Sequence, residues 1–184
     1  MKENKSLYWH PTIYEYNPDT GLYTKDQIFF GSAYYVWTTG EATAFPDGFK
    51  MIAGFNGDPK ARATAECVNP SPCERQNCET IDDSFFPKTA CAELEVSMVF
   101  PTCWNGVDND SIDHMSHVSY DLEGGNFDGD CPDEFPVKLP EIHFYFRIVP
   151  YSGGAHIFSD GTSFFHSDYF SGWDSNELQI VLVS

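Results

Sequence analysis

Three histidines and two aspartates have the types and spacings that general acid–base chemistry needs. His114 and His117 form an H-x-x-H pair beside Asp113, and His166 lies two residues before Asp168. Histidine titrates near neutral pH, and a neighbouring carboxylate fixes its tautomer. A fold that gathers these groups would let them transfer protons at a glycosidic or uronate linkage. We therefore take His114, His117, His166, Asp113 and Asp168 as candidate catalytic residues.

The same residues allow three other interpretations. Two carboxylates such as Asp113 and Asp168 could act as acid and base in glycoside hydrolysis. The H-x-x-H pair with His166 could offer three nitrogens to zinc or copper, although this spacing does not place both rings on one side of an extended chain. Asp113, His114 and Ser116 could instead form local hydrogen bonds that organise their loop. The sequence assigns no metal ligand and predicts no cofactor, and it leaves a divalent metal open.

Five further residues are candidates for substrate binding. Tryptophans beside polar motifs can stack on sugar rings, although tryptophans in β-sandwiches more often pack in or around the core. The polar face of one predicted strand suits a sugar-binding groove and equally a solvated sheet surface. The candidates are Trp104, Trp173, Asp174, Tyr145 and Arg147.

Six cysteines in the middle of the chain predict disulfide bonds. They are even in number and contain no C-x-x-C pair of the zinc-ribbon kind. We favour the pairings Cys67–Cys91, Cys103–Cys131 and Cys73–Cys78, although six cysteines permit fifteen arrangements. Disulfides persist in oxidising compartments, so we expect an extracellular or cell-surface protein. Glycosylation sequons at Asn4 and Asn109 fit that setting.

Composition narrows the range of partners. The 184 residues include ten Lys and Arg against 28 Asp and Glu, a formal net charge of −18. This charge repels phosphate backbones, so we expect no nucleic-acid partner. No apolar run is long enough to span a bilayer. A polysaccharide or other glycan is the expected partner, and self-association stays open.

The elements that would position these residues are mostly strands. Leu94–Met98 alternates with period two, and so does Ile142–Val149, while Ala33–Thr39 is rich in aromatic and β-branched residues. We also predict a closing strand at Leu178–Val183, where β-branching favours strand over a short terminal helix. Turn clusters between short strands favour an all-β, antiparallel β-sandwich or jelly-roll-like fold with long disulfide-stapled loops. Residues 1–184 fit a single domain, and its N-terminus could be truncated.

A series of motifs in register resembles a known family, the fungal secreted domain of unknown function nineteen ninety-six. The motifs are Tyr8-Trp-His-Pro11, Phe45-Pro-Asp-Gly-Phe-Lys-Met-Ile-Ala-Gly54, Phe100-Pro-Thr-Cys-Trp-Asn-Gly106, Asp113-His-Met-Ser-His-Val118, Cys131-Pro132, Pro136-Val-Lys-Leu-Pro140, Phe158-Ser-Asp-Gly161 and His166-Ser-Asp-Tyr-Phe-Ser-Gly-Trp-Asp174. The resemblance implies an exported protein in an extracellular glycan context, since members sometimes carry WSC modules. Members usually begin with a Ser-x-His-x-His segment, which this chain lacks before Tyr8.

Two functional hypotheses follow. In the first, a secreted or surface-exposed domain binds or cleaves cell-wall polysaccharide through a His/Asp cluster, as a hydrolase or lyase if it is an enzyme. In the second, it is a non-catalytic structural or assembly protein of an extracellular surface.

Overall fold

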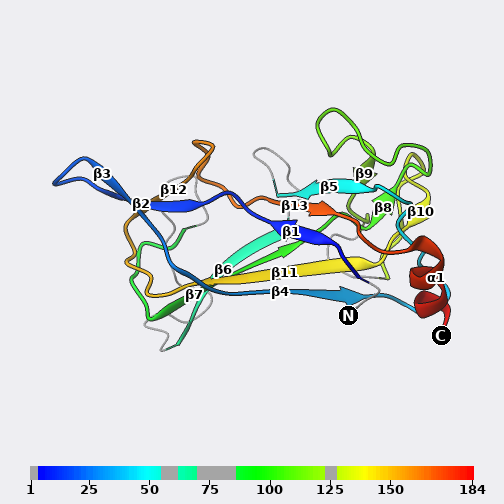
Figure 1. Cartoon of the computed structure of the whole chain (residues 1–184), viewed down its shortest axis with the longest axis horizontal. Helices are drawn as coiled ribbons and strands as arrows, with labels where there is room; N and C mark the ends of the chain where they lie inside the picture. Colours follow the sequence, from blue (N-terminus) through cyan, green and yellow to red (C-terminus); the bar gives the residue numbers. More distant parts are fainter. Residues whose placement is uncertain (1–3, 55–61, 70–85, 123–127) are drawn as a thin grey trace.

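Two layers of antiparallel strands make up this structure, a computed structural model that describes residues 4–54, 62–69, 86–122 and 128–184 (Figure 1). One layer is a four-stranded sheet in the order β4–β11–β7–β6. The other layer holds two three-stranded sheets, β1–β13–β5 and β12–β2–β3, and a small sheet β10–β8–β9 lies near the single helix of the described part, α1. This architecture confirms the all-β prediction. The strands are β1 (Leu7–Trp9), β2 (Ile13–Asn17), β3 (Leu22–Lys25), β4 (Ile28–Val36), β5 (Lys50–Ala53), β6 (Arg62–Asn69), β7 (Glu93–Val99), β8 (Cys103–Trp104), β9 (Val118–Ser119), β10 (Val137–Lys138), β11 (Glu141–Ile148), β12 (Ala155–Phe158) and β13 (Ser167–Phe170).

Strict alternation of apolar and polar residues explains the two central strands. In β11 the side chains of Ile142, Phe144, Phe146 and Ile148 are buried, and those between them are partly exposed. In β7 the buried positions are Leu94, Val96 and Met98. Because side chains point to opposite faces at successive strand positions, each pattern fixes which face of the sheet meets the core. Both strands were predicted at these places.

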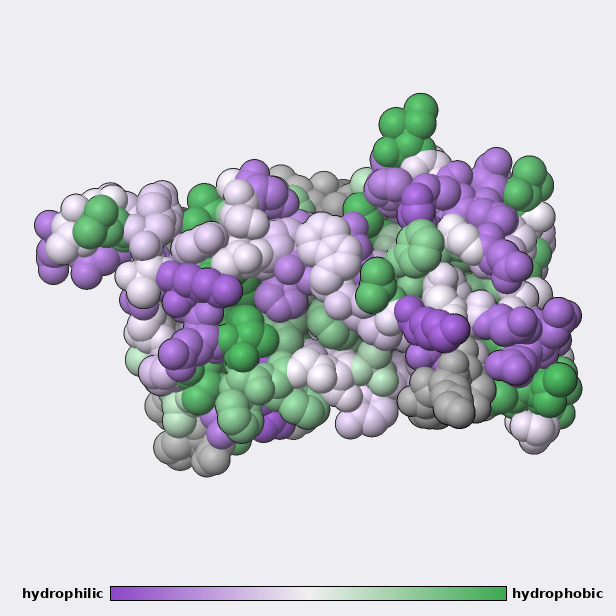
Figure 2. Space-filling view, in the orientation of Figure 1, coloured by the Kyte–Doolittle hydropathy of each residue, from purple (hydrophilic) through white to green (hydrophobic). Residues whose placement is uncertain are grey.

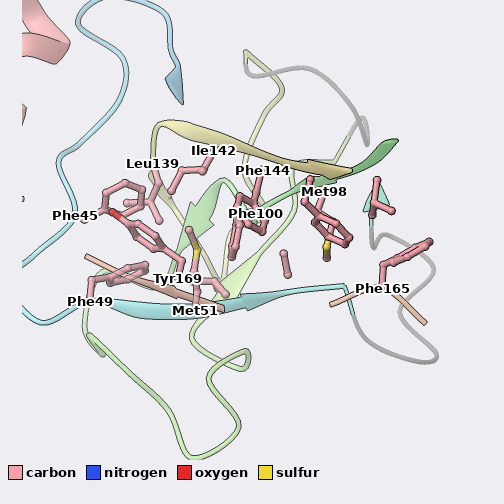
Figure 3. Packing of buried hydrophobic residues seen from close by; sticks show 14 of the residues in the cluster. Phe45, Phe49, Met51, Met98, Phe100, Leu139, Ile142, Phe144, Phe165 and Tyr169 are labelled. Carbon is pink, nitrogen blue, oxygen red and sulfur yellow. The ribbon is translucent and has the colours of Figure 1, made fainter. Parts of the chain in front are cut away.

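An aromatic core joins the two layers. Phe144 and Met98 from the four-stranded sheet face Tyr169 and Met51 of the β1–β13–β5 sheet, with Phe100 between them (Figure 3). All five side chains are at most 7% exposed. Burying a large apolar side chain contributes about 1.5–3 kcal/mol, so this contact holds the two layers together. It therefore also fixes the position of the outward faces of both sheets.

The prediction of a closing strand at Leu178–Val183 is wrong. These residues belong to α1 (Ser175–Val183), whose N-cap is Asp174, and one Asp174 oxygen accepts hydrogen bonds from the backbone N–H groups of Asn176 and Glu177. Leu178 and Leu182, four residues apart, share the buried side of the helix. The cap and this spacing outweigh the strand preference of the β-branched residues.

The strand predicted at Ala33–Thr39 is present, but with other bounds. Strand β4 runs over Ile28–Val36, so it begins before the predicted Ala33–Thr39 and ends before Trp37.

Two of the predicted disulfides are confirmed. Cys67 is bonded to Cys91, and Cys103 is bonded to Cys131. The predicted Cys73–Cys78 bond lies outside the described residues.

The visible surface is mixed in character. Hydrophilic residues predominate over the loops near β8 and β9, at the upper right of Figure 2, and hydrophobic residues are interspersed elsewhere on that face. Within the described residues, no helix has both the length and the apolar character needed to cross a bilayer.

Candidate functional site

The outward face of the β1–β13–β5 sheet carries a row of polar and aromatic side chains. Alternation along the three short strands places Tyr8, Tyr169 and Met51 on the core side, where burial raises the pKa of the Tyr169 hydroxyl to about 12. The residues between them face outward. We call this surface the outer platform; its residues are Leu7, Trp9, Lys50, Ile52, Asp168 and Phe170.

Trp9 and Asp168 form the centre of the outer platform. They are direct cross-strand partners, as are Asp168 and Ile52 on the other side of β13. Side chains at such positions have Cβ atoms about 4.5–5.5 Å apart. The Trp9 residue is 53% exposed, whereas Asp168 is half-buried. An exposed indole therefore lies beside a carboxylate that is partly shielded from water.

The carboxylate of Asp168 is electrostatically coupled to two histidines. Burial raises the pKa of the Asp168 carboxyl above its ordinary value, and the imidazoles of His166 and His114 partly offset this rise. Within the described residues, no hydrogen bond to this carboxylate is formed. The fold thus brings together three of the five predicted catalytic residues, namely His114, His166 and Asp168.

His166 is held in place by the turn before β13. Its Nδ1 donates to the carbonyl of Phe164 at 3.1 Å, and its Nε2 lies 2.9 Å from an oxygen of Asp160. Asp160 in turn accepts hydrogen bonds from the backbone N–H and the hydroxyl of Thr162. The imidazole is therefore fixed between a carbonyl and an anchored carboxylate, and both of its ring nitrogens are engaged.

His114 lies beside β5, at one edge of the outer platform. Its backbone has φ 56°, and its carbonyl accepts a hydrogen bond from the N–H of Ile52 at 3.0 Å, so the loop extends the sheet beyond β5. The His114 Nδ1 is hydrogen-bonded to Asp110, whose other oxygen lies 3.0 Å from the Lys50 ammonium. His114 and His166 are thus both oriented by carboxylates.

The other two predicted catalytic residues build the loop itself. His117 is buried, with its Nε2 2.7 Å from the Lys50 carbonyl and its Nδ1 2.8 Å from the Ser111 hydroxyl. Asp113 accepts hydrogen bonds from the backbone N–H groups of Ser116 and Met115, and these bonds hold the pKa of its carboxyl well below the usual range. Both ring nitrogens of His117 are engaged, so the H-x-x-H pair does not present two free nitrogens.

The metal interpretation gains no support from this loop. Across the part of the chain that the structure describes, no three His, Cys, Asp or Glu side chains stand together as a ready ligand set for a metal ion.

The predicted binding residues Trp104, Trp173 and Asp174 lie toward the end of the sandwich that carries α1. The Trp104 indole N–H donates to the Asp108 carbonyl at 2.7 Å, and that of Trp173 donates to the Tyr35 hydroxyl at 3.2 Å. Both rings are partly buried against the core. Asp174 caps α1. Each of the three therefore has a structural partner in the fold.

The remaining two predicted binding residues lie on the opposite outer surface. Tyr145 and Arg147 project from the outward face of β11, where Tyr145 packs edge-on against Tyr34. The Arg147 guanidinium forms ion pairs with Glu95 at 2.8 Å and Glu93 at 2.9 Å. They are separated from the outer platform by the whole core, so the predicted site residues do not form one cluster.

Several residues of the site were not predicted, and Trp9 and Asp160 are two of them. Trp9 lies in the Tyr8-Trp9-His10-Pro11 motif, and in its short strand Leu7 and Trp9 are exposed on either side of the partly buried Tyr8. Asp160 orients His166 but lies six residues before it in the chain, so no short motif joins them.

The comparisons with known proteins identify the class of this domain. A model of the family described as "Domain of unknown function (DUF1996)" matches residues 1–173, which is nearly the whole chain. The chain belongs to this family. No curated protein and no solved structure matches it.

Proposed function

We propose that this chain is an extracellular polysaccharide-binding domain and that the glycan lies across the outer platform. The observation that carries the proposal is the pairing of exposed Trp9 with half-buried Asp168. Sugar rings present an apolar face and a rim of hydroxyl groups. An exposed indole suits the apolar face, and a carboxylate suits the hydroxyl groups.

The rest of the outer platform supports an extended ligand. Leu7 is 61% exposed and Phe170 is 39% exposed, with the Lys50 ammonium 5.7 Å from the Phe170 ring centre. Apolar side chains gathered on one face and edged by polar groups are characteristic of binding surfaces. A flat strip of this kind fits a polymer chain better than a small molecule, which needs a concave pocket.

An extracellular setting is the second part of the proposal. Two disulfides cross-link the described residues, and such bonds persist in oxidising compartments. The resemblance to fungal exported proteins that sometimes carry WSC modules adds a cell-wall context to this proposal. The net charge of −18 disfavours polyanionic glycans and favours neutral or basic ones.

Binding to a panel of cell-wall polysaccharides tests the proposal, with affinity electrophoresis or sedimentation with insoluble glycans as the measurement. We expect Trp9→Ala to weaken binding about tenfold, the loss of roughly 1.4 kcal/mol. Tyr34→Ala is the matched control, because Tyr34 is 57% exposed on the opposite outer surface. Loss of binding in Tyr34→Ala alone would move the site to the surface of Tyr145 and Arg147. No binding to any glycan would favour a structural or assembly role.

Glycan cleavage is a second candidate, and one specific observation favours it. Two imidazoles, each held by a carboxylate, flank the Asp168 carboxyl, whose pKa is raised by burial. A carboxyl with a raised pKa can act as a general acid, and the His114 imidazole, held through Nδ1 by Asp110, can act as a base through Nε2. New reducing ends or unsaturated products, measured with and without a chelator, would show cleavage. We expect Asp168→Asn to abolish it; cleavage that survives in Asp168→Asn would exclude this site.

A further inference from the structure

A second group of ionisable side chains lies in the β12–β2–β3 sheet, away from the outer platform. His156 in β12 is the direct cross-strand partner of Glu15 in β2, so both side chains project from the same face. Asp26 directly follows β3, and its backbone N–H donates to the carbonyl of Ile13 in β2 at 3.0 Å. Three potential metal ligands thus come from three neighbouring segments of one sheet.

The imidazole of His156 is fixed and fully buried. It is sandwiched between the rings of Phe86 and Tyr151, with ring centres 5.0 and 4.8 Å away. Its Nδ1 donates to the carbonyl of Gly154 at 2.7 Å. In the neutral ring this bond leaves the lone pair on Nε2. Metal-binding histidines show the same arrangement, in which the second ring nitrogen is held by a carbonyl or carboxylate.

The lone-pair nitrogen of His156 faces Asp26. Nε2 lies 3.5 Å from Oδ2 of Asp26, and the two side chains are 0% and 8% exposed. Neither atom has a hydrogen-bond partner among the described residues. An unsatisfied buried polar atom destabilises the fold.

We propose that Asp26 and His156 bind a divalent transition-metal ion of the zinc type, with Glu15 completing the ligand set after a change of rotamer. A tetrahedral ion with bonds of about 2.0–2.2 Å to nitrogen and oxygen holds its donor atoms roughly 3.3–3.5 Å apart. The observed separation of 3.5 Å matches this spacing. Mixed imidazole and carboxylate ligands suit zinc better than calcium or magnesium.

The surroundings give such an ion access and further ligands. A hollow of about 630 Å³ opens beside the site, and Asp26 is one of its lining residues. Water can enter there and occupy a remaining coordination position, as in open zinc sites. The lining residues are Lys25, Asp26, Gln27, Ile28, Phe29 and Val149.

A shared proton is the competing occupant of the same space. One proton between Oδ2 and Nε2 would satisfy both atoms without any metal. The two cases differ in what they predict, because only a metal site binds added metal ions at a pH where the Asp26 carboxylate is ionised.

Cobalt titration of the chelator-treated protein tests the proposal, because Co²⁺ occupies zinc sites and absorbs visible light when tetrahedral. We expect one equivalent to bind, with the absorption lost on competition by Zn²⁺. Asp26→Asn and His156→Gln should each weaken Co²⁺ binding at least tenfold. Glu15→Gln should weaken it less, and His143→Gln is the matched control, since His143 is another carboxylate-paired imidazole.

Circular dichroism in the presence of a chelator checks that each variant folds. If His156→Gln does not fold, the comparison of Co²⁺ affinity between wild type and Asp26→Asn tests the proposal. Absence of a one-equivalent Co²⁺ complex in the wild type overturns the proposal in favour of the shared proton. Equal Co²⁺ affinity in wild type and Asp26→Asn also overturns it. This readout involves no glycan, so its result is independent of the proposed polysaccharide binding.

Discussion

Trp9 and Asp168 are direct partners across the antiparallel pair β1 and β13, and both face outward. The indole therefore reports the charge of the carboxyl beside it. Burial raises the pKa of Asp168, so the carboxyl takes up a proton at a higher pH than the ordinary value of about 3.9. We expect Trp9 fluorescence to titrate above that value.

The measurement is the difference in emission between wild type and Trp9→Phe as pH is lowered, because the chain has three other tryptophans. Asp168→Asn should remove the titration. A difference signal that persists unchanged in Asp168→Asn would contradict the pairing as the source of the effect.

Asp174 provides a second prediction, because its carboxylate caps α1 through Asn176 and Glu177. Asp174→Ala should lower the free energy of unfolding by about 1 kcal/mol, and Asp174→Ser should restore most of it. Urea denaturation measures both. If the residue acts only as a cap, glycan binding is unchanged in both variants. Loss of binding in the well-folded Asp174→Ser variant would instead support its predicted contact with substrate.

The strands and disulfides were predictable where local pattern decides structure. The alternation in β7 and β11 requires only the period of side chains along a strand, and it gave both strands with their inward faces. It failed at α1, where β-branched residues favour a strand. There the cap by Asp174 and the pair Leu178 and Leu182 favour a helix, and packing against the rest of the molecule decides.

The site was predictable only in part, because register between distant segments is not encoded in spacing. Sequence placed His166 near Asp168, which is a local relation. It could not bring Trp9 opposite Asp168, since β1 and β13 lie at opposite ends of the chain. Nor could it separate His114, which is 41% exposed, from His117, which is buried and holds the loop.

The two glycosylation sequons differ in their surroundings, which leads to a third prediction. The Asn109 side chain is exposed, and its amide donates to the Asp47 carbonyl. The Asn4 amide donates to the Tyr8 hydroxyl, and its oxygen accepts from the Ser6 N–H in a partly buried position. We expect Asn109 to carry a glycan after secretion, and Asn4 to carry none.

Intact-mass spectrometry of protein from a secreting eukaryotic host measures this occupancy. Asn109→Gln should lose the mass of one glycan, and Asn4→Gln should leave the mass of the attached glycan unchanged. A glycan found on Asn4 would show that modification precedes the folding of this segment.

His117 makes the stability of the loop beside the outer platform sensitive to acid. Burial lowers the pKa of its imidazole below the ordinary value of about 6.5. As pH falls below that value, the unfolded chain takes up a proton that the folded ring resists, so the free energy of unfolding decreases.

His117→Gln should lower the free energy of unfolding by about 1–3 kcal/mol near neutral pH, because it disrupts bonds to Lys50 and Ser111. The variant should also show a shallower loss of stability on acidification. Urea denaturation from about pH 8 to pH 5 measures both effects. His10 and His156, whose pKa values are also lowered by burial, contribute to the slope in both proteins. An equal slope in wild type and His117→Gln would mean that His117 titrates alike in the folded and unfolded states.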